Sequence, residues 1–236
     1  MFEQFFIVSM ARSGTNYLRD WINAERRYHC LGEIFRSQGD SFQELADLYG
    51  IDRPTTEYCA RNDKAGLWKQ IIDAAQRRGV NPGAKIFYYH ANARDPIWDI
   101  IDTARVIHLI RLNALAVYVS RELANGSGLW QSRFYKKNYE AQQIVVDPEQ
   151  FLQLRATRDR QIEWVRDRFA GPRYHEIFYE EFVNARDRSA VVAHAMGARG
   201  GWREPSRRTT KQRRRPLSEI VKNYAEVAEF DANTLS

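Results

Sequence analysis

Cysteine is scarce in this sequence: Cys30 and Cys59 are the only two among 236 residues. Two cysteines are too few for a disulfide framework, and their spacing matches no zinc-binding pattern. Long apolar runs are also missing, since no stretch approaches the roughly 20 consecutive apolar residues that a membrane-spanning helix needs. Residues 1–10 are apolar but carry Glu3 and no basic start, which is typical of a strand rather than a signal peptide. We therefore expect a cytoplasmic protein with reduced thiols and no integral membrane segment.

Acidic residues are outnumbered, with 30 Asp and Glu against 36 Lys and Arg, which gives a net charge of +6. Much of the basic excess lies in residues 203–216. A basic excess favours anionic partners such as nucleic acid, a membrane surface or a phosphorylated cofactor. A basic run of this kind is more often a solvated or disordered segment than a ligand-binding loop. The charge alone therefore does not choose among these partners.

Short apolar runs alternate with helical patterns along the chain. Strands are predicted at 5–8, 30–34, 85–89, 105–110 and 174–178, and helices at 41–49, 64–78, 94–101, 113–123, from 147 onward, 180–196 and 217–230. A further helix is expected directly after the first strand, and 125–139 is expected to be a loop. The alternation predicts an α/β fold with a central parallel sheet flanked by helices, formed by one domain over residues 1–236.

One predicted helix contains an unexpected charge. Asp147 and Pro148 are typical of its N-cap and first residue. Its apolar face would carry five large side chains, and Arg158 is the one exception on that face. The members of the face are Phe151, Leu154, Ile162, Val165 and Phe169.

The segments that follow the strands contain the candidate functional residues. In parallel α/β sheets, ligands bind beyond the carboxyl ends of the strands. The loop after the first strand, His90 after the third and Arg111 after the fourth all fall at this edge. Their coincidence is the first indication of a binding site.

The loop after the first strand has the composition of an anion site. Its Gly14 lets the backbone approach a ligand closely, and the first amides of the following helix have no intrahelical partner. The side chains of Ser13, Thr15 and Asn16 would add donors. By itself the turn is interpreted equally well as an ordinary capped helix.

The same loop lacks the Gly-Lys-Ser/Thr of a nucleoside-triphosphate P-loop. Gly14 is followed by Thr15 and Asn16, and the cation, Arg12, comes before the glycine. This order places a charge beside the terminal transferable group of a ligand and does not clamp a triphosphate. An ATPase or kinase is therefore disfavoured.

Residues 5–18 resemble the 5′-phosphosulfate loop of sulfotransferases that use 3′-phosphoadenosine 5′-phosphosulfate (PAPS), in the bacterial form with Arg-Ser-Gly-Thr. Residues 106–120 resemble the second signature of that family, a strand that ends in Arg111 followed by a helix that carries Ser120. Shorter segments at 29–35, 83–90, 177–182 and 211–227 resemble the carbohydrate, nodulation-type or glycolipid-type branch. The resemblance covers nearly the whole chain except residues 126–146, and it implies a P-loop-like three-layer sandwich.

The resemblance implies roles for individual residues. Arg12 would contact the bridging oxygen and the leaving phosphate, while the loop holds the 5′-phosphate. Arg111 and Ser120 would bind the 3′-phosphate, with residues 203–216 closing over the nucleotide. The cofactor-binding set is then Arg12, Ser13, Gly14, Thr15, Asn16, Arg111, Ser120, Lys211 and Arg215. No metal is expected, because a sulfuryl group carries less charge than a phosphoryl group and fixed cations can stabilise it.

An attacking hydroxyl needs a base within hydrogen-bond reach. Glu33, in the segment that resembles the catalytic carboxylate of this branch, is the first candidate, and His90 is the second. Glu33 could equally be a strand-end carboxylate paired with an arginine, and a lone histidine is more often structural.

The acceptor is expected to be a hydroxyl group of a carbohydrate or glycolipid. Aromatic residues in 130–139 could stack on sugars, although ordinary packing explains each of them as well. The alternatives are a small-molecule kinase or other phosphotransferase on a similar fold, and a nucleic-acid binder built on the basic tail. The tail lacks interleaved aromatic residues, so nucleic acid is not expected as a partner. The oligomeric state, a homo-oligomer included, stays open.

Overall fold

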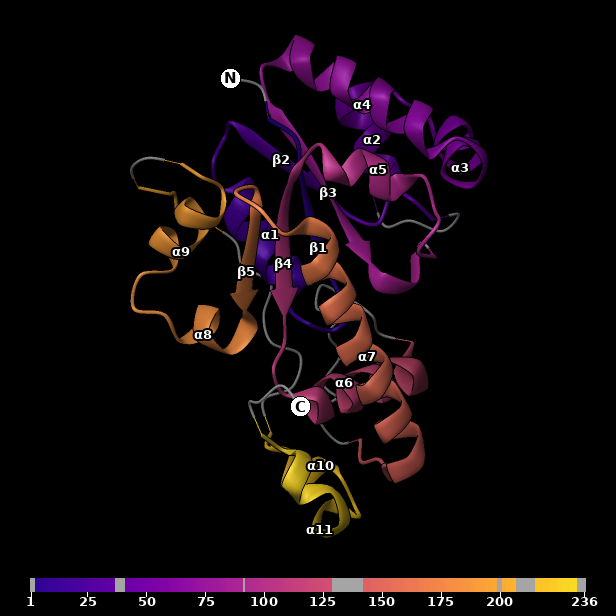
Figure 1. Ribbon diagram of the computed structural model, residues 1–236, viewed down its shortest axis with the longest axis vertical. Coiled ribbons are helices and arrows are strands. Elements are labelled where there is room, and N and C mark those ends of the chain that lie inside the picture. Colours follow the sequence, from indigo (N-terminus) through magenta and orange to yellow (C-terminus); the bar gives the residue numbers. More distant parts are fainter. Residues whose placement is uncertain are drawn as a thin grey trace.

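The computed structural model describes residues 3–36, 41–90, 92–128, 142–198, 201–206 and 215–232. Five parallel strands form one central sheet in the order β2-β3-β1-β4-β5 (Figure 1). The middle strand is buried on both faces, which explains its unbroken apolar sequence. The predicted parallel α/β fold is confirmed. The strands are β1 (Phe5–Ser9), β2 (Tyr28–Leu31), β3 (Asn81–Phe87), β4 (Arg105–Ile110) and β5 (Tyr174–Phe178).

Helices cover both faces of the sheet. Neighbouring side chains of β1 point to opposite faces, so Phe6 and Val8 enter one core while Phe5 and Ile7 enter the other. Against the first face pack α2 (Phe42–Tyr49), α3 (Arg53–Asn62), α4 (Lys64–Arg78), α5 (Ile97–Asp102) and α7 (Pro148–Phe169). Against the second pack α1 (Thr15–Asn23), α8 (Tyr179–Asn184) and α9 (Arg188–Ala195).

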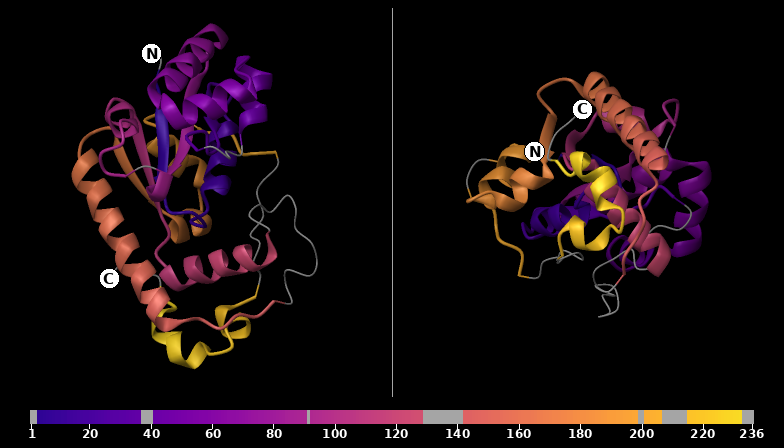
Figure 2. Two further views of the ribbon diagram at one scale, coloured as in Figure 1. Left: turned by 90° about the vertical axis from the view of Figure 1, so that its right-hand side faces the viewer. Right: turned by 90° about the horizontal axis from the view of Figure 1, so that it is seen from below.

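A third apolar cluster is formed by helices that lie beyond the carboxyl ends of the strands, and Figure 2 shows the position of these helices. It joins α6 (Ala114–Ser127) to the first half of α7 and to the short helices α10 (Leu217–Ile220) and α11 (Tyr224–Val227). A parallel bridge pairs Ile144 with Val221. The last turn, Ala228–Phe230, precedes Asp231, which accepts a hydrogen bond from Asn113 Nδ2 at 2.7 Å. The C-terminal segment therefore reaches the start of α6, next to the end of β4.

Several predicted boundaries are wrong. The predicted helix 180–196 is broken, because Asp187 begins a new helix by accepting from the amide of Ala190. The predicted terminal helix 217–230 is interrupted where Val221 pairs with Ile144. The helix α3 was not predicted, although Asp52 caps it. The other shifts are small: β2 and β3 begin earlier than predicted, α5 begins at Ile97 after Pro96, and α6 extends to Ser127.

The exception on the α7 face, Arg158, proves to be buried, with 2% of its surface exposed. Its Nη2 donates to the carbonyl of Arg111 at 2.5 Å and to that of Leu112 at 3.4 Å, and its Nη1 donates to Asp159 at 2.6 Å. The charge is therefore matched to carbonyls at the end of β4. This arginine is part of the support for the turn that carries Arg111.

We predict that Arg158→Met lowers the free energy of unfolding by about 2 kcal/mol, since it leaves buried carbonyl groups without their donor. Urea denaturation measures the change. The matched control is Arg155→Met on the same helix, where the side chain is partly exposed and 4.0 Å from Asp159; its cost should stay below about 1 kcal/mol. Equal losses in the two variants would contradict a specific role for Arg158.

Candidate functional site

The loop between β1 and α1 has a backbone that few residues adopt. Arg12 has φ of 70° and Gly14 has φ of 91°, both in the left-handed region. A Cβ atom on Gly14 would lie 2.3 Å from the ring of Tyr179, so glycine satisfies both the conformation and the close approach. The positive φ of Arg12 is a strained conformation that the surroundings must hold in place.

Contacts from the β4–α6 unit hold this loop. Arg111 Nη1 donates to the carbonyl oxygen of Arg12 at 3.0 Å. Arg12 Nε in turn donates to Ser120 Oγ on α6 at 3.0 Å. Three predicted site residues from two distant segments of the chain are thus in direct contact.

The guanidinium group of Arg111 is buried, and burial lowers its pKa from the usual value. It lies over the ring of Tyr179 at 5.1 Å, and its Nε is 3.8 Å from Glu180 Oε1. In the described part of the chain this Nε has no hydrogen-bond acceptor. A buried cationic donor with spare capacity is suited to binding an anion.

Glu180 supports the same turn from the other side. Its carboxylate oxygens accept from the amides of Leu112 at 2.9 Å and Asn113 at 3.3 Å. Glu180 binds the amides of the β4–α6 turn and Arg158 binds its carbonyls, so the backbone next to Arg111 is fixed. The Tyr-Glu pair at 179–180 was noted in the sequence only as part of the family resemblance.

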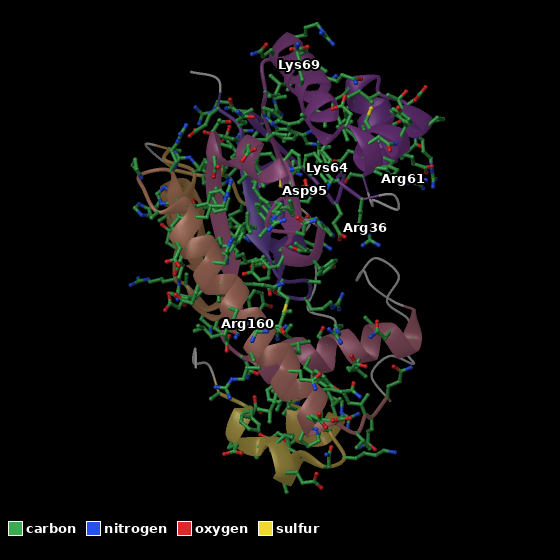
Figure 3. All side chains as sticks on the ribbon, turned by 45° about the vertical axis from the view of Figure 1, so that its right-hand side comes forward. Arg36, Arg61, Lys64, Lys69, Asp95 and Arg160 are labelled. Atoms are coloured by element: carbon green, nitrogen blue, oxygen red, sulfur yellow. The ribbon has the colours of Figure 1, made fainter. Side chains whose placement is uncertain are left out.

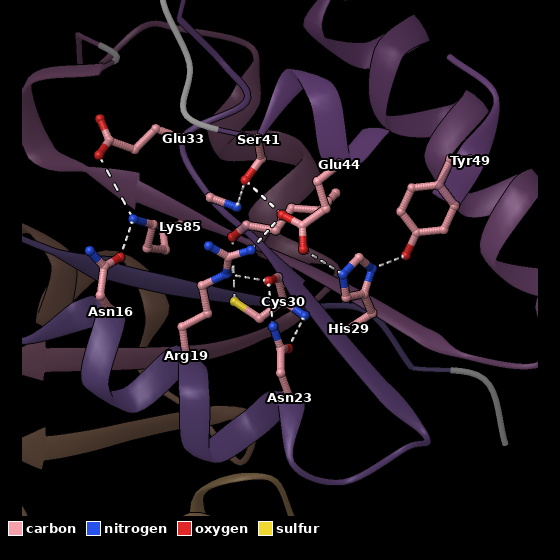
Figure 4. Close-up of polar contacts among 12 residues, drawn as sticks. Asn16, Arg19, Asn23, His29, Cys30, Glu33, Ser41, Glu44, Tyr49 and Lys85 are labelled. Carbon is pink, nitrogen blue, oxygen red and sulfur yellow. Dashed lines mark hydrogen bonds and ion pairs between the residues drawn. The ribbon is translucent and has the colours of Figure 1, made fainter. Parts of the chain in front are cut away.

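Glu33 lies beyond β2 and is next to two cationic side chains, Arg36 and Lys85. Arg36 Nη1 donates to Glu33 Oε2 at 3.0 Å. Lys85 Nζ is 3.8 Å from Glu33 Oε1 (Figure 4). Lys85, which is 1% exposed, also donates to Asn16 Oδ1 at 2.7 Å. This lysine therefore links the β1–α1 loop to Glu33. The sequence signal for this role of Lys85 is a single lysine inside an otherwise apolar strand. No role was predicted for this residue.

The His90 ring lies next to Glu33, and a contact with the backbone sets its orientation. Its Nδ1 accepts from the amide of Phe87 at 3.1 Å, so the proton of the neutral ring is on Nε2. That Nε2 is 3.3 Å from Glu33 Oε2. Both candidate bases are thus adjacent, although among the described residues this Nε2 has no hydrogen-bond partner.

A second polar network fixes the segment that precedes Glu33 (Figure 4). Gly32 N donates to Ser41 Oγ at 2.7 Å, and this hydroxyl donates to Glu44 at 2.9 Å. Glu44 also accepts from Arg19 at 2.5 Å and pairs with His29 at 2.9 Å. Helices α1 and α2 are thereby tied to the end of β2.

With this geometry in place, comparison with known proteins gives a consistent result. A family model described as the sulfotransferase family matches residues 4–191, which is most of the chain. This chain belongs to the sulfotransferase family. Among curated proteins, no match to the sequence is found.

Solved structures of sulfotransferases have the same fold. The sulfotransferase domain from the Synechococcus PCC 7002 olefin synthase is 16% identical, with a TM-score of 0.55 and coverage of 99% of this chain and 84% of that one. The domain from the curacin biosynthetic pathway is 13% identical, with a TM-score of 0.56 and coverage of 100% and 88%. A sulfotransferase from Alicyclobacillus acidocaldarius is 17% identical, with a TM-score of 0.54 and coverage of 98% and 93%.

The remaining predicted site residues of this sulfotransferase lie as follows. Ser13 and Thr15 are buried at the start of α1, with exposed fractions of 2% and 5%. Arg215 donates to Glu219 Oε2 at 2.9 Å, one turn further along. Lys211 and the aromatic residues of 130–139 lie outside the described residues.

Over the described ranges, none of the helices is long and apolar enough to cross a membrane. The same ranges contain no group of three or more His, Cys, Asp or Glu side chains arranged to hold a metal ion.

We predict that Gly14→Ala destabilises the protein by more than Gly50→Ala. Both glycines have positive φ, but a Cβ on Gly50 would meet no atom within 4 Å. The control should cost about 1–2 kcal/mol for the left-handed backbone alone, and Gly14→Ala should cost a further 1–3 kcal/mol, roughly, for the clash with Tyr179. Thermal and urea unfolding measure both. Identical losses would show that Tyr179 does not constrain the loop.

Acid stability should depend on Glu44. Burial raises the pKa of Glu44, but the hydrogen bond from His29 and the charge of Arg19 lower it by more than this. The resulting pKa is about 2, compared with an ordinary value of 4.5. The ionised carboxylate therefore stabilises the fold above pH 4.5, and this stabilisation is lost as the pH falls toward 2.

In urea titrations, Glu44→Gln should flatten the loss of stability between pH 4.5 and 2. The control Glu57→Gln, at a residue paired with Arg53 on the surface of α3, should leave the profile as in the wild type. A wild-type profile for Glu44→Gln would rule out this contribution.

Proposed function

We propose that this sulfotransferase moves the sulfuryl group of PAPS to a hydroxyl group of a carbohydrate or glycolipid, as in the nodulation-type or glycolipid-type branch. The observation that carries the proposal is the contact of Arg12 with both Arg111 and Ser120. It brings together two segments, one suited to a 5′-phosphosulfate and the other to a 3′-phosphate. One adenosine bisphosphate could span groups so close together.

In the proposed donor site the amide end of α1 holds the 5′-phosphate, helped by Thr15 and Asn16. The Nε of Arg12 exchanges its hydrogen bond to Ser120 for the leaving phosphate oxygens, where negative charge develops. Arg111 and Ser120 bind the 3′-phosphate. Residues 203–216, with Lys211 and Arg215, close over the nucleotide as part of the single domain 1–236. The contact of Asn113 with Asp231 supports this closure, since it brings the C-terminal segment to the same edge.

The transfer step is an in-line displacement at sulfur. The acceptor oxygen forms a bond to sulfur while the bond from sulfur to the bridging oxygen breaks, and the electron pair leaves with the 5′-phosphate. Glu33 takes the acceptor proton, and the ring of His90 lies beside that carboxylate, with its Nε2 3.3 Å from Glu33 Oε2. Lys85, between Asn16 and Glu33, supplies a fixed positive charge beside the transferred group.

The acceptor class rests on the resemblance of the segments around Glu33 and the C-terminal region. The names of two structural neighbours refer to an olefin synthase and to the curacin pathway, and these describe those proteins only. A sulfate-transfer screen over sugars and glycolipids would test the proposed acceptor class.

The donor site makes a prediction about nucleotide selectivity. Ser120→Ala should weaken binding of 3′,5′-phosphoadenosine by about tenfold or more, because a hydrogen bond to a charged group is lost. Binding of 5′-AMP should not change. Isothermal titration calorimetry measures both, with Ser127→Ala on the same helix as the control. Equal weakening of the two nucleotides would remove Ser120 from the 3′-phosphate site.

The proposed base makes a separate prediction. Glu33→Gln should bind 3′,5′-phosphoadenosine as the wild type does and lose at least about 100-fold in transfer rate. A radiolabelled-sulfate assay on the acceptor found in the screen measures the rate. Unchanged turnover would exclude Glu33 from the mechanism.

A further inference from the structure

A separate cavity of about 510 Å³ lies between the turn Tyr88–His90, the start of α5 and the middle of α7. Its volume is within the range of pockets that bind small molecules. Among the described residues, none of those assigned above to the donor nucleotide lines it. Neither the family match nor the structural neighbours assign this cavity a ligand.

Aromatic rings form one part of the lining. The hydroxyl of Tyr88 is bonded to His108 Nε2 at 2.6 Å, and Trp98 Nε1 donates to the carbonyl of Asn92 at 2.8 Å. Both rings are nearly buried, at 7% and 2% exposed, so the aromatic surface open to a ligand comes mainly from Tyr89, which is 56% exposed. Trp164 packs edge-to-face on Trp98 with ring centroids 4.8 Å apart and extends this surface.

Polar side chains of α7 form another part. Thr157, Arg160, Gln161 and Trp164 recur at spacings of three and four residues, so they lie on one face of the helix, and all four line the cavity. Arg160 Nη2 donates to Thr157 Oγ1 at 3.2 Å, and Arg160 is labelled on α7 in Figure 3. No carboxylate is found among the described lining residues. This face offers planar donors and acceptors to hydroxyl or anionic groups.

The opposite wall is fixed before any ligand binds. The ion pair of Lys64 with Asp95 holds the segment that follows Asn92 (Figure 3). Asp95 Oδ1 also accepts from the amide of Ile97 at 3.0 Å, and the Trp98 indole holds the Asn92 carbonyl. A preformed wall lowers the entropy cost of binding.

The cavity adjoins the candidate base. Tyr89 lines it, and the Tyr89 ring contacts that of His90 edge-on with centroids 4.8 Å apart. His90 Nε2 is 3.3 Å from Glu33 Oε2. Tyr89 and His90 therefore lie between the cavity and Glu33.

We propose that this cavity binds one sugar ring of the acceptor, with the C–H face of the ring on the aromatic side chains and its hydroxyl groups on Arg160 and Gln161. The assignment of the ring to the acceptor rests on the proposed function. An aromatic acceptor would use the rings but would form no hydrogen bonds with Arg160 and Gln161 on the polar face of α7. The amphipathic lining thus favours a sugar.

Saturation-transfer NMR on the full chain tests this. The probes are the methyl glycosides of glucose, N-acetylglucosamine and glucuronic acid, with 4-nitrophenol as the aromatic comparison. We expect saturation of the ring C–H protons of at least one glycoside. Arg160→Ala and Gln161→Ala should weaken its binding at least about fivefold, since each removes a hydrogen bond.

Gln153→Ala is the matched control, because Gln153 is an exposed glutamine on the same helix that does not line the cavity. It should bind the glycoside as the wild type does. No saturation of any glycoside, saturation of 4-nitrophenol alone, or equal glycoside binding by all three variants would each overturn the proposal.

The experiment needs no sulfuryl donor, so it is separable from the donor-site proposal. Wild-type protein that binds 3′,5′-phosphoadenosine but no glycoside would overturn the cavity assignment and leave the donor site intact. Glycoside binding that depends on Arg160 and Gln161, without any nucleotide binding, would support the cavity and overturn the proposed function. An unchanged thermal unfolding midpoint in each variant confirms that it is folded, whether or not the protein binds the nucleotide.

Discussion

The hydrogen bond from the buried guanidinium of Arg111 to the carbonyl of Arg12 is the contact on which the candidate site depends. It joins the loop after β1 to the turn after β4, two neighbouring strands of the sheet. A buried cation is costly unless its surroundings compensate it. The ring of Tyr179 and the carboxylate of Glu180 provide that compensation, so the turn after β5 belongs to the same unit.

This unit explains why the loop can keep an unusual backbone. The left-handed conformations of Arg12 and Gly14 persist because Tyr179 packs against the glycine and Arg111 holds the carbonyl. Arg158 and Glu180 fix the turn that carries Arg111, so the constraint extends to α7 and α8. The loop is therefore positioned before any ligand binds, and preorganised charge is what electrostatic stabilisation of a transferred group requires.

One short segment, the turn Tyr88–His90, contacts both Glu33 and the cavity. The turn Tyr88–His90 presents His90 to Glu33 and presents Tyr88 and Tyr89 to the cavity. Lys85, in the strand before it, contacts Asn16 of the β1–α1 loop. In the proposed reaction, a donor on the β1–α1 loop and an acceptor in the cavity meet at the end of β3.

The parallel sheet and its binding edge could be predicted because β1 and β4 are short apolar runs that lead directly into Arg12 and Arg111. The roles of Arg158 and Glu180 could not, because a buried charge is indistinguishable in sequence from a solvated one until its backbone partners are known. The break near Asp187 and the interruption at Val221 were missed for a related reason. A local cap and a long-range bridge overrode a helical pattern that continued through both.

The cavity was likewise beyond reach from sequence, since Trp98 and Trp164 come from helices far apart in the chain. The aromatic residues that the sequence offered for sugar stacking, in 130–139, lie outside the described residues.

A crystal structure of the protein with 3′,5′-phosphoadenosine tests the central claim most directly. The account predicts the 5′-phosphate on the first amides of α1 beside Arg12, and the 3′-phosphate on Arg111 and Ser120, with the Arg111 bond to the Arg12 carbonyl retained. A nucleotide bound elsewhere, or bound here with its 3′-phosphate turned away from Arg111, would contradict it.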